Sequence, residues 1–131
     1  MQGLHLTADL HGCACAPAWL TDAALLGQRC VLAVNASQLQ AVAQLFHTFP
    51  ATPHGPGGVT ATVLLAESHL CVHTWPEQRA VTLDVYVCNF GGDHTTKAHA
   101  LMDTLCTLFE PKQVTRHSLR RGELANPQLV V

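Results

Sequence analysis

The chain opens with strict alternation of apolar and polar residues from Leu4 to Leu10, which predicts a half-buried β-strand. From Asp22 to about Asn35 the apolar residues recur at helical spacing, and Thr21 and Asp22 are suited to cap the first turn. A stronger helical pattern runs from Thr95 to Phe109, with its apolar residues on one face and Pro111 after its end. These patterns predict one strand and two helices.

Three apolar, β-branched runs lie between the helices, at Val59–Ala66, Ser68–Trp75 and Ala80–Cys88. Very short connections separate them, and because a parallel pair needs a long crossover, we expect antiparallel neighbours. Another strand is predicted over Lys112–Leu119. The sequence therefore places most strands in the second half of the chain.

The segment from Gln38 to Phe49 is ambiguous from its pattern alone. Its apolar spacing fits a helix, whereas its end, LFHTF, alternates like a strand. The stretch from Pro50 to Gly58 is a loop, with three prolines and three glycines. At 131 residues the chain fits a single domain. We predict an α+β fold, a two-layer α/β sandwich with a mainly antiparallel sheet and two helices on one face.

Composition narrows the possible partners. Apolar residues make up 48% of the chain and charged residues 12%, which excludes a disordered or coiled-coil protein. The net charge is −2, and the only basic cluster, from Arg116 to Arg121, is short. Nucleic acid and anionic membranes require a broader basic surface, so neither is an expected partner. We interpret the arginines as the solvated end of the last strand.

Neither a signal peptide nor a run of eighteen apolar residues is apparent, so a cytoplasmic protein with reduced thiols is expected. The chain nevertheless has six cysteines and nine histidines, which raises the question of a metal. Strand alternation places His69, Cys71 and His73 on one face, a row that would suit zinc or copper. His11, Cys13 and Cys15 form a weaker second group, for which a loop with buried thiols is the alternative. We predict no metal site.

A third interpretation of the same region rests on a longer pattern. It consists of Glu-Ser-His, then His-Thr-Trp-Pro-Glu, then a strand ending in Asp-x-aromatic-x-Cys, and here it occupies 67–69, 73–77 and 84–88. This resembles the signature of the S-adenosylmethionine decarboxylase proenzymes of the short bacterial and archaeal type. The resemblance extends to Gly12-Cys13, Phe46 to Phe49 and Gly58 to Thr60, and spans roughly residues 4 to 120. It also favours a strand for the ambiguous segment.

The resemblance implies a proenzyme that cuts itself. The Ser68 hydroxyl would attack the carbonyl of Glu67, and elimination would leave chains 1–67 and 68–131, with Ser68 converted to a pyruvoyl group. That group forms a Schiff base with a substrate amine and withdraws electrons, as pyridoxal phosphate does in other enzymes. The substrate would be S-adenosylmethionine, and its decarboxylated product supplies aminopropyl groups for spermidine.

Roles for individual residues also follow from the resemblance. His73 would transfer protons during processing, a task suited to imidazole. Thr60 stands where the family usually has a serine that assists processing. Cys88 matches the proton donor that acts after CO2 has left. One geometric conflict remains, because His73 is five positions after Ser68 and alternation places the two side chains on opposite faces. A bulge, or a chain end freed at Ser68, would remove the conflict.

The ligand-binding residues implied by the resemblance are Phe49 and Trp75, which would flank adenine, and Glu77, which would bind the ribose hydroxyls. Sequence reasoning also allows a core position for either aromatic residue and an exposed turn for Glu77. A homodimer of cleaved protomers is expected, with Phe49 able to reach the other protomer's pocket. No role follows for His69.

Three departures from the family pattern border this predicted site. The loop from Phe49 to Gly58 is longer than usual, the stretch 89–98 replaces a commoner glycine-rich turn, and His11 stands where an aromatic residue is frequent. A related decarboxylase of L-ornithine or L-arginine is therefore one alternative, although such substrates have less need of stacking aromatics. The other alternative is an unprocessed regulatory or metal-binding homologue that is not an enzyme.

Overall fold

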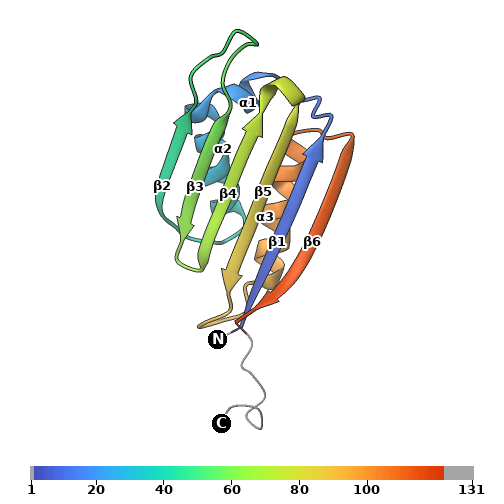
Figure 1. The fold of residues 1–131 in the computed structure, drawn as a ribbon. Helices are drawn as coiled ribbons and strands as arrows, with labels where there is room; N and C mark the ends of the chain where they lie inside the picture. Colours follow the sequence, from blue (N-terminus) through green and yellow to red (C-terminus); the bar gives the residue numbers. More distant parts are fainter. Residues whose placement is uncertain (1, 123–131) are drawn as a thin grey trace, which may run out of the picture.

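The computed structural model describes residues 2–122, and it contains one six-stranded antiparallel sheet (Figure 1). The strand order is β2-β3-β4-β5-β1-β6. The strands are β1 (Gly3–His11), β2 (Ala41–Thr48), β3 (Val59–Leu65), β4 (Ser68–Trp75), β5 (Ala80–Cys88) and β6 (Gln113–Arg121). The helices are α1 (Ala18–Thr21), α2 (Ala23–Ala36) and α3 (Thr95–Leu108), and η1 (Pro76–Gln78) is a 3-10 turn. The predicted α+β sandwich is confirmed, and the ambiguous segment is a strand.

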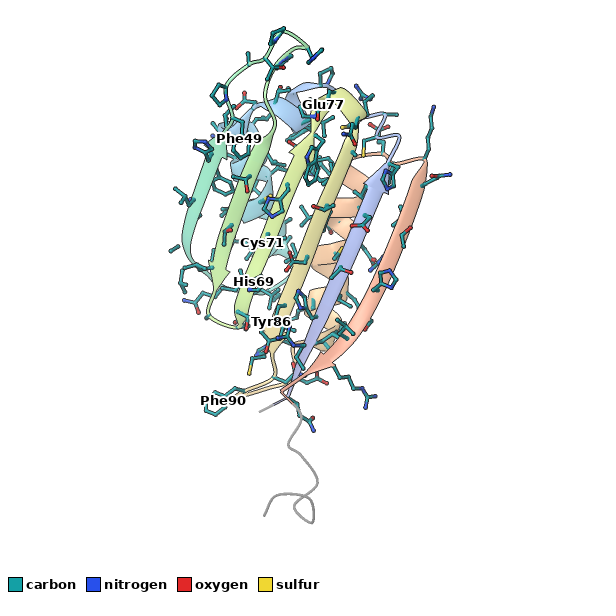
Figure 2. The ribbon with its side chains drawn as sticks, in the orientation of Figure 1. Phe49, His69, Cys71, Glu77, Tyr86 and Phe90 are labelled. Carbon is teal, nitrogen blue, oxygen red and sulfur yellow. The ribbon has the colours of Figure 1, made fainter. Side chains whose placement is uncertain are left out.

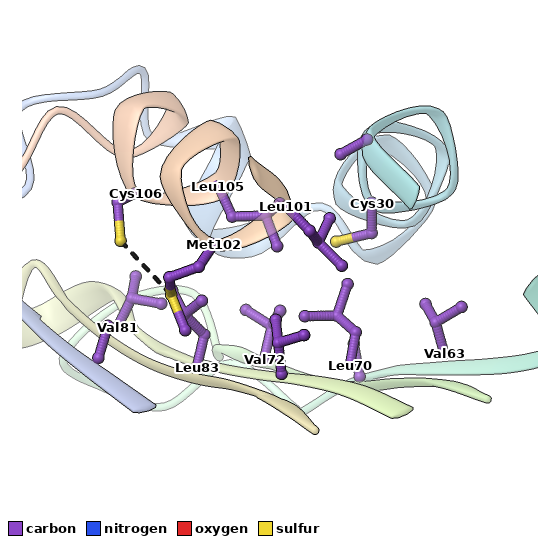
Figure 3. Packing of buried hydrophobic residues seen from close by; sticks show 14 of the residues in the cluster. Cys30, Val63, Leu70, Val72, Val81, Leu83, Leu101, Met102, Leu105 and Cys106 are labelled. Carbon is purple, nitrogen blue, oxygen red and sulfur yellow. Dashed lines mark hydrogen bonds between the residues drawn. The ribbon is translucent and has the colours of Figure 1, made fainter. Parts of the chain in front are cut away.

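The helices α2 and α3 lie on one face of the sheet, as Figure 1 shows, and the described residues leave the other face uncovered. Alternate residues of the central strands pack against these helices, as seen for Leu70, Val72 and Leu83 (Figure 3). On the helix side, Leu101 and Met102 fill the space opposite them. Each large apolar side chain buried in this way contributes about 1.5–3 kcal/mol, so this layer provides most of the stability. The short helix α1 was not predicted.

Local features explain where the elements begin and end. The side chain of Asp22 accepts a hydrogen bond from the backbone N–H of Leu25 (3.0 Å), as predicted for the cap of α2. Every residue of β6 is exposed, and Arg116 binds Asp103 at 2.6 Å. The basic cluster is therefore a solvated last strand, as its sequence indicated.

The strands β3 and β4 form a tight hairpin whose turn is Ala66 and Glu67. Its register pairs Leu65 with Ser68 and Thr60 with His73. β4 then pairs with β5 without interruption from Ser68 to Trp75. This hairpin, η1 and β5 together carry the whole signature.

Two further observations concern membranes and thiols. Among the described residues, no helix combines the length and the apolar character needed to cross a bilayer. All six cysteines are free.

Candidate active site

Five of the predicted residues line a single cleft of about 910 Å³ at the Trp75 end of β4. This volume suits a drug-sized ligand or cofactor. The five residues come from the end of β2, from β3, from β4 and from η1; they are Phe49, Thr60, His73, Trp75 and Glu77.

Polar and aromatic groups alternate along this cleft. The Thr60 hydroxyl lies 2.7 Å from Nδ1 of His73, within hydrogen-bond distance. The rings of His73 and Trp75 are 6.4 Å apart. Phe49 and Trp75 are 49% and 39% exposed, so neither is a core residue and both offer apolar surface to a ligand.

The long loop between β2 and β3 forms another wall of the cleft. Thr52 and His54 line it together with neighbouring prolines and glycines, and Figure 2 shows the loop extending beyond Phe49 and Glu77. Gly58 allows this loop to return tightly, because a Cβ there would lie 2.1 Å from the carbonyl oxygen of Thr74. His54 was not among the predicted site residues. Its only signal in the sequence is its place between Phe49 and Thr60.

The remaining predicted residues, Glu67, Ser68 and Cys88, lie at the other end of β4. The backbone N–H of Cys88 donates to the carbonyl oxygen of Glu67 at 2.7 Å. Ser68 pairs with Val87 and has a φ of 154°, a region that favours glycine. The predicted residues thus form two groups rather than one.

The two groups cannot meet within one protomer. β4 is unbroken from Ser68 to His73, and five residues of strand span roughly 16 Å at about 3.3 Å per residue. The same continuity excludes the bulge that could have turned both side chains to one face. The conflict noted in the sequence is therefore real for the uncut, single chain.

The three side chains considered as metal ligands on β4 do not form one site. His69, Cys71 and His73 each have a different neighbour: Asp84, Thr62 and Thr60, respectively. Pairing with separate partners on adjacent strands holds the three side chains apart.

Another cluster, made of His5, His69 and Asp84, brings potential ligand atoms within 4.8 Å of one another. Nε2 of each histidine lies 2.9 Å from Oδ2 of Asp84. Arg121, which can only donate, lies 3.0 Å from Nδ1 of His5, so that nitrogen accepts and Nε2 carries the hydrogen that Asp84 accepts. These contacts link the three side chains and Arg121 in one hydrogen-bonded network.

The weaker candidate group is also a poor ligand set. Cys13 and Cys15 are buried, and burial raises the pKa of Cys13 to about 11. Among the described residues, these side chains do not belong to a group whose ligand atoms lie close enough together to share a metal ion. His11 lies at the exposed end of β1.

The class that the fold defines is the α+β sandwich, here with one open sheet face, an aromatic cleft that contains a hydroxyl–imidazole pair, and a Glu-Ser bond in a tight turn. Comparison with known proteins gives the family. The family model described as S-adenosylmethionine decarboxylase matches residues 4–122. The chain belongs to the S-adenosylmethionine decarboxylase family.

Individual relatives agree with this assignment. A protein of Aquifex aeolicus named S-adenosylmethionine decarboxylase proenzyme is 38% identical over 121 residues, covering 92% of this chain and 81% of the relative. A protein of the same name from Parasynechococcus marenigrum is 34% identical and covers 99% of this chain and 91% of the relative. The crystal structure of the adenosylmethionine decarboxylase from Aquifex aeolicus superposes with a TM-score of 0.80. It is 33% identical and covers 94% of this chain and 92% of that one.

Proposed function

We propose that this chain cleaves itself between Glu67 and Ser68 and that the product decarboxylates S-adenosylmethionine, supplying aminopropyl groups for spermidine. The observation that carries the proposal is the position of the Glu-Ser bond of the family signature. It lies in the β3–β4 turn, and Ser68 has a φ of 154°.

A serine in this backbone region is strained. Such conformations cost about 1–3 kcal/mol and persist only where the surrounding structure enforces them. Here the ladders on both sides of β4 enforce it, since Ser68 pairs with Leu65 and with Val87. Cleavage at Glu67–Ser68 would release this strain, which favours reaction at this bond.

The strand order is compatible with a cut at this position. Chain 1–67 would contain β1, β2 and β3, whereas chain 68–131 would contain β4, β5 and β6. In the sheet, β1 lies between β5 and β6, and β4 pairs with β3. The two chains would therefore remain interleaved, and one sheet would survive processing.

A pyruvoyl group made from Ser68 fits this end of the molecule. Ser68 is half-buried and is the first residue of β4, directly after the turn. When present, the group supplies a ketone that binds a substrate amine and withdraws electrons from the bond to the carboxylate. The Cys88 thiol, at the adjacent end of β5, would hold the proton that is returned to the substrate carbon.

The separation of the two groups of residues supports a homodimer. The helices cover only one face of the sheet. Its strands carry exposed leucine side chains, namely Leu45 (75% exposed), Leu64 (47%) and Leu119 (54%). If two such faces packed together about a twofold axis perpendicular to the strands, the strands of the two protomers would run in opposite directions. The Ser68 end of one protomer would then lie against the cleft of the other. Each site would then combine Ser68 and Cys88 with His73 and Thr60 of a second copy.

The cleft supports S-adenosylmethionine as the substrate. Phe49 and Trp75 offer aromatic surfaces for a flat base, and Glu77 offers a carboxylate for hydroxyl groups or a cation. Ornithine and arginine have no flat base to stack on Phe49 and Trp75, although Glu77 also offers a carboxylate to their distal cation, so the two aromatic residues carry the preference. The test is CO2 release from the three substrates by the same preparation. We expect release from S-adenosylmethionine; release only from ornithine or arginine would contradict the assignment.

A further inference from the structure

The turn η1 lines the cleft, but none of its side chains is buried in a way that could fix its position. Its cleft residue, Glu77, is exposed, and so is Trp75 directly before the turn. Exposed side chains gain little free energy from packing, so the turn has to be held at its ends. Arg79 forms one of these ends, and its N–H donates to the carbonyl oxygen of Pro76 at 3.1 Å.

Arg79 has a backbone conformation that an arginine rarely adopts. Its φ of 47° lies in the left-handed region, which glycine adopts freely and other residues adopt at a cost in free energy. Its side chain offsets this cost, because Nε donates to the carbonyl oxygen of Cys13 at 2.5 Å and Nη2 to that of Cys15 at 2.6 Å. The N–H of Cys13 in turn donates to the carbonyl oxygen of Arg79 at 2.9 Å. We call these three hydrogen bonds the Arg79 clamp.

Segment 13–20, which includes most of α1, gives the clamp a fixed base, since several of its side chains are buried in the core. It also binds β4 directly, because the buried Thr74 hydroxyl donates to the carbonyl oxygen of Leu20 at 2.6 Å. The same segment therefore holds the chain at two points, at Thr74 before the cleft residues and at Arg79 after them.

We propose that Arg79 is a positioning residue for substrate binding, and that its clamp holds Trp75 and Glu77 in place in the cleft. Arg79 and Glu77 together line a cavity of about 180 Å³ beside the cleft, and Glu77 lines both. The clamp also crosses the proposed cut, because it joins residues 13 and 15 of chain 1–67 to Arg79 of chain 68–131. It would therefore keep the cleft aligned after cleavage. The inference rests on the proposed function, since it concerns how the same site is prepared for its substrate.

The experiment compares glycine substitutions at two residues with positive φ. Arg79→Gly removes the guanidinium and relieves the backbone. Gln38→Gly is the matched control, because Gln38 is exposed, has a φ of 63° and makes no side-chain hydrogen bond among the described residues. Arg79→Lys keeps the charge but lacks the planar fork that spans two carbonyl oxygens. Each preparation is cleaved to completion, as judged by intact mass, before kcat and KM are measured with S-adenosylmethionine.

The clamp predicts that KM changes and kcat does not, because the groups it holds bind the substrate away from the bond that breaks. Misplacing contact groups by about 1 Å can cost about 100-fold, so we expect Arg79→Gly to raise KM by about 10- to 100-fold. Arg79→Lys should behave similarly, and Gln38→Gly should match the wild type. A purely structural role would instead reduce the amount of active enzyme, and with it kcat, at an unchanged KM. That result, or a wild-type KM in Arg79→Gly or Arg79→Lys, would overturn the inference.

A binding measurement separates this inference from the proposed function. The adenosine thioether 5′-methylthioadenosine has neither the amine nor the carboxylate of the substrate, and calorimetry with Ser68→Ala chains requires neither cleavage nor decarboxylation. Adding Arg79→Gly should weaken binding by about 10- to 100-fold, whereas adding Gln38→Gly should not. Equal affinity with and without Arg79, or binding by neither protein, would overturn the inference. Normal binding by a wild-type chain that never cleaves, or that releases no CO2, would refute the proposed function alone.

Discussion

The strain at Ser68 gives a quantitative prediction for the uncut chain. Ser68→Gly and Ser68→Ala both remove the hydroxyl, so neither should cleave. Alanine retains the strain of a φ of 154°, about 1–3 kcal/mol, whereas glycine adopts this region freely. Glycine loses about 0.5–1 kcal/mol through the greater freedom of the unfolded chain. The glycine variant should therefore be more stable by roughly 0.5–2 kcal/mol, or about 2–7 °C in Tm for a domain of this size.

The assay is chemical and thermal denaturation of the two variants at equal protein concentration, since association would also change Tm. Ser118 is the matched control, because it lies in the exposed strand β6 and is not among the residues with positive φ. There the order should reverse, with Ser118→Gly less stable than Ser118→Ala by about 0.5–1 kcal/mol. If Ser68→Gly is less stable than Ser68→Ala, the strain argument is wrong.

Three further predictions concern the thiols and the cleft. Cys88→Ala should cleave normally and decarboxylate poorly, as judged by intact mass and CO2 release; normal decarboxylation would exclude the thiol as proton donor. Trp75→Ala should raise KM for S-adenosylmethionine roughly 5- to 150-fold, from about 1–3 kcal/mol of lost stacking, while Leu32→Ala, on the helix side and 59% exposed, should not. Burial raises the pKa of Cys30 to about 12, so in folded protein at pH 8 iodoacetamide should label it only after denaturation. Labelling of Cys30 as fast as that of half-exposed Cys88 would contradict this.

The sequence predicted the architecture well because its local patterns agree with the tertiary structure. The alternation in β1 and the apolar face of α3 both point to the core that the structure contains. The segment 38–49 could not be settled by its pattern, because β2 is an edge strand, largely exposed, with little burial to enforce alternation. The four-residue helix α1 was missed for a similar reason, since it is too short to show a period.

The site was only partly predictable. The resemblance to the family identified Phe49, Thr60, His73, Trp75 and Glu77, and the structure brings these five into one cleft. Strand alternation predicted only that Ser68 and His73 point to opposite faces, and the length of β4 was needed to show that one protomer cannot join the two groups of residues.

Features that depend on the pairing register of the strands could not be predicted from the sequence. The bond from the N–H of Cys88 to Glu67 exists because Ser68 lies opposite Val87, and no local pattern specifies that pairing. The same is true of the network of His5, His69 and Asp84, whose members lie on three different strands. The absence of nucleic-acid and membrane partners and the cytoplasmic location stay predictions.

The central claim is that the bond between Glu67 and Ser68 breaks by the chain's own chemistry, and intact mass spectrometry tests it most directly. After prolonged incubation, purified protein should give two masses, for residues 1–67 and for 68–131, the latter without a free amine. Ser68→Ala should remain whole, and the two wild-type chains should co-elute under native conditions because β1 is interleaved with β5 and β6. A single uncut mass for the wild-type protein, or a Ser68→Ala variant cut at the same bond, would contradict the account.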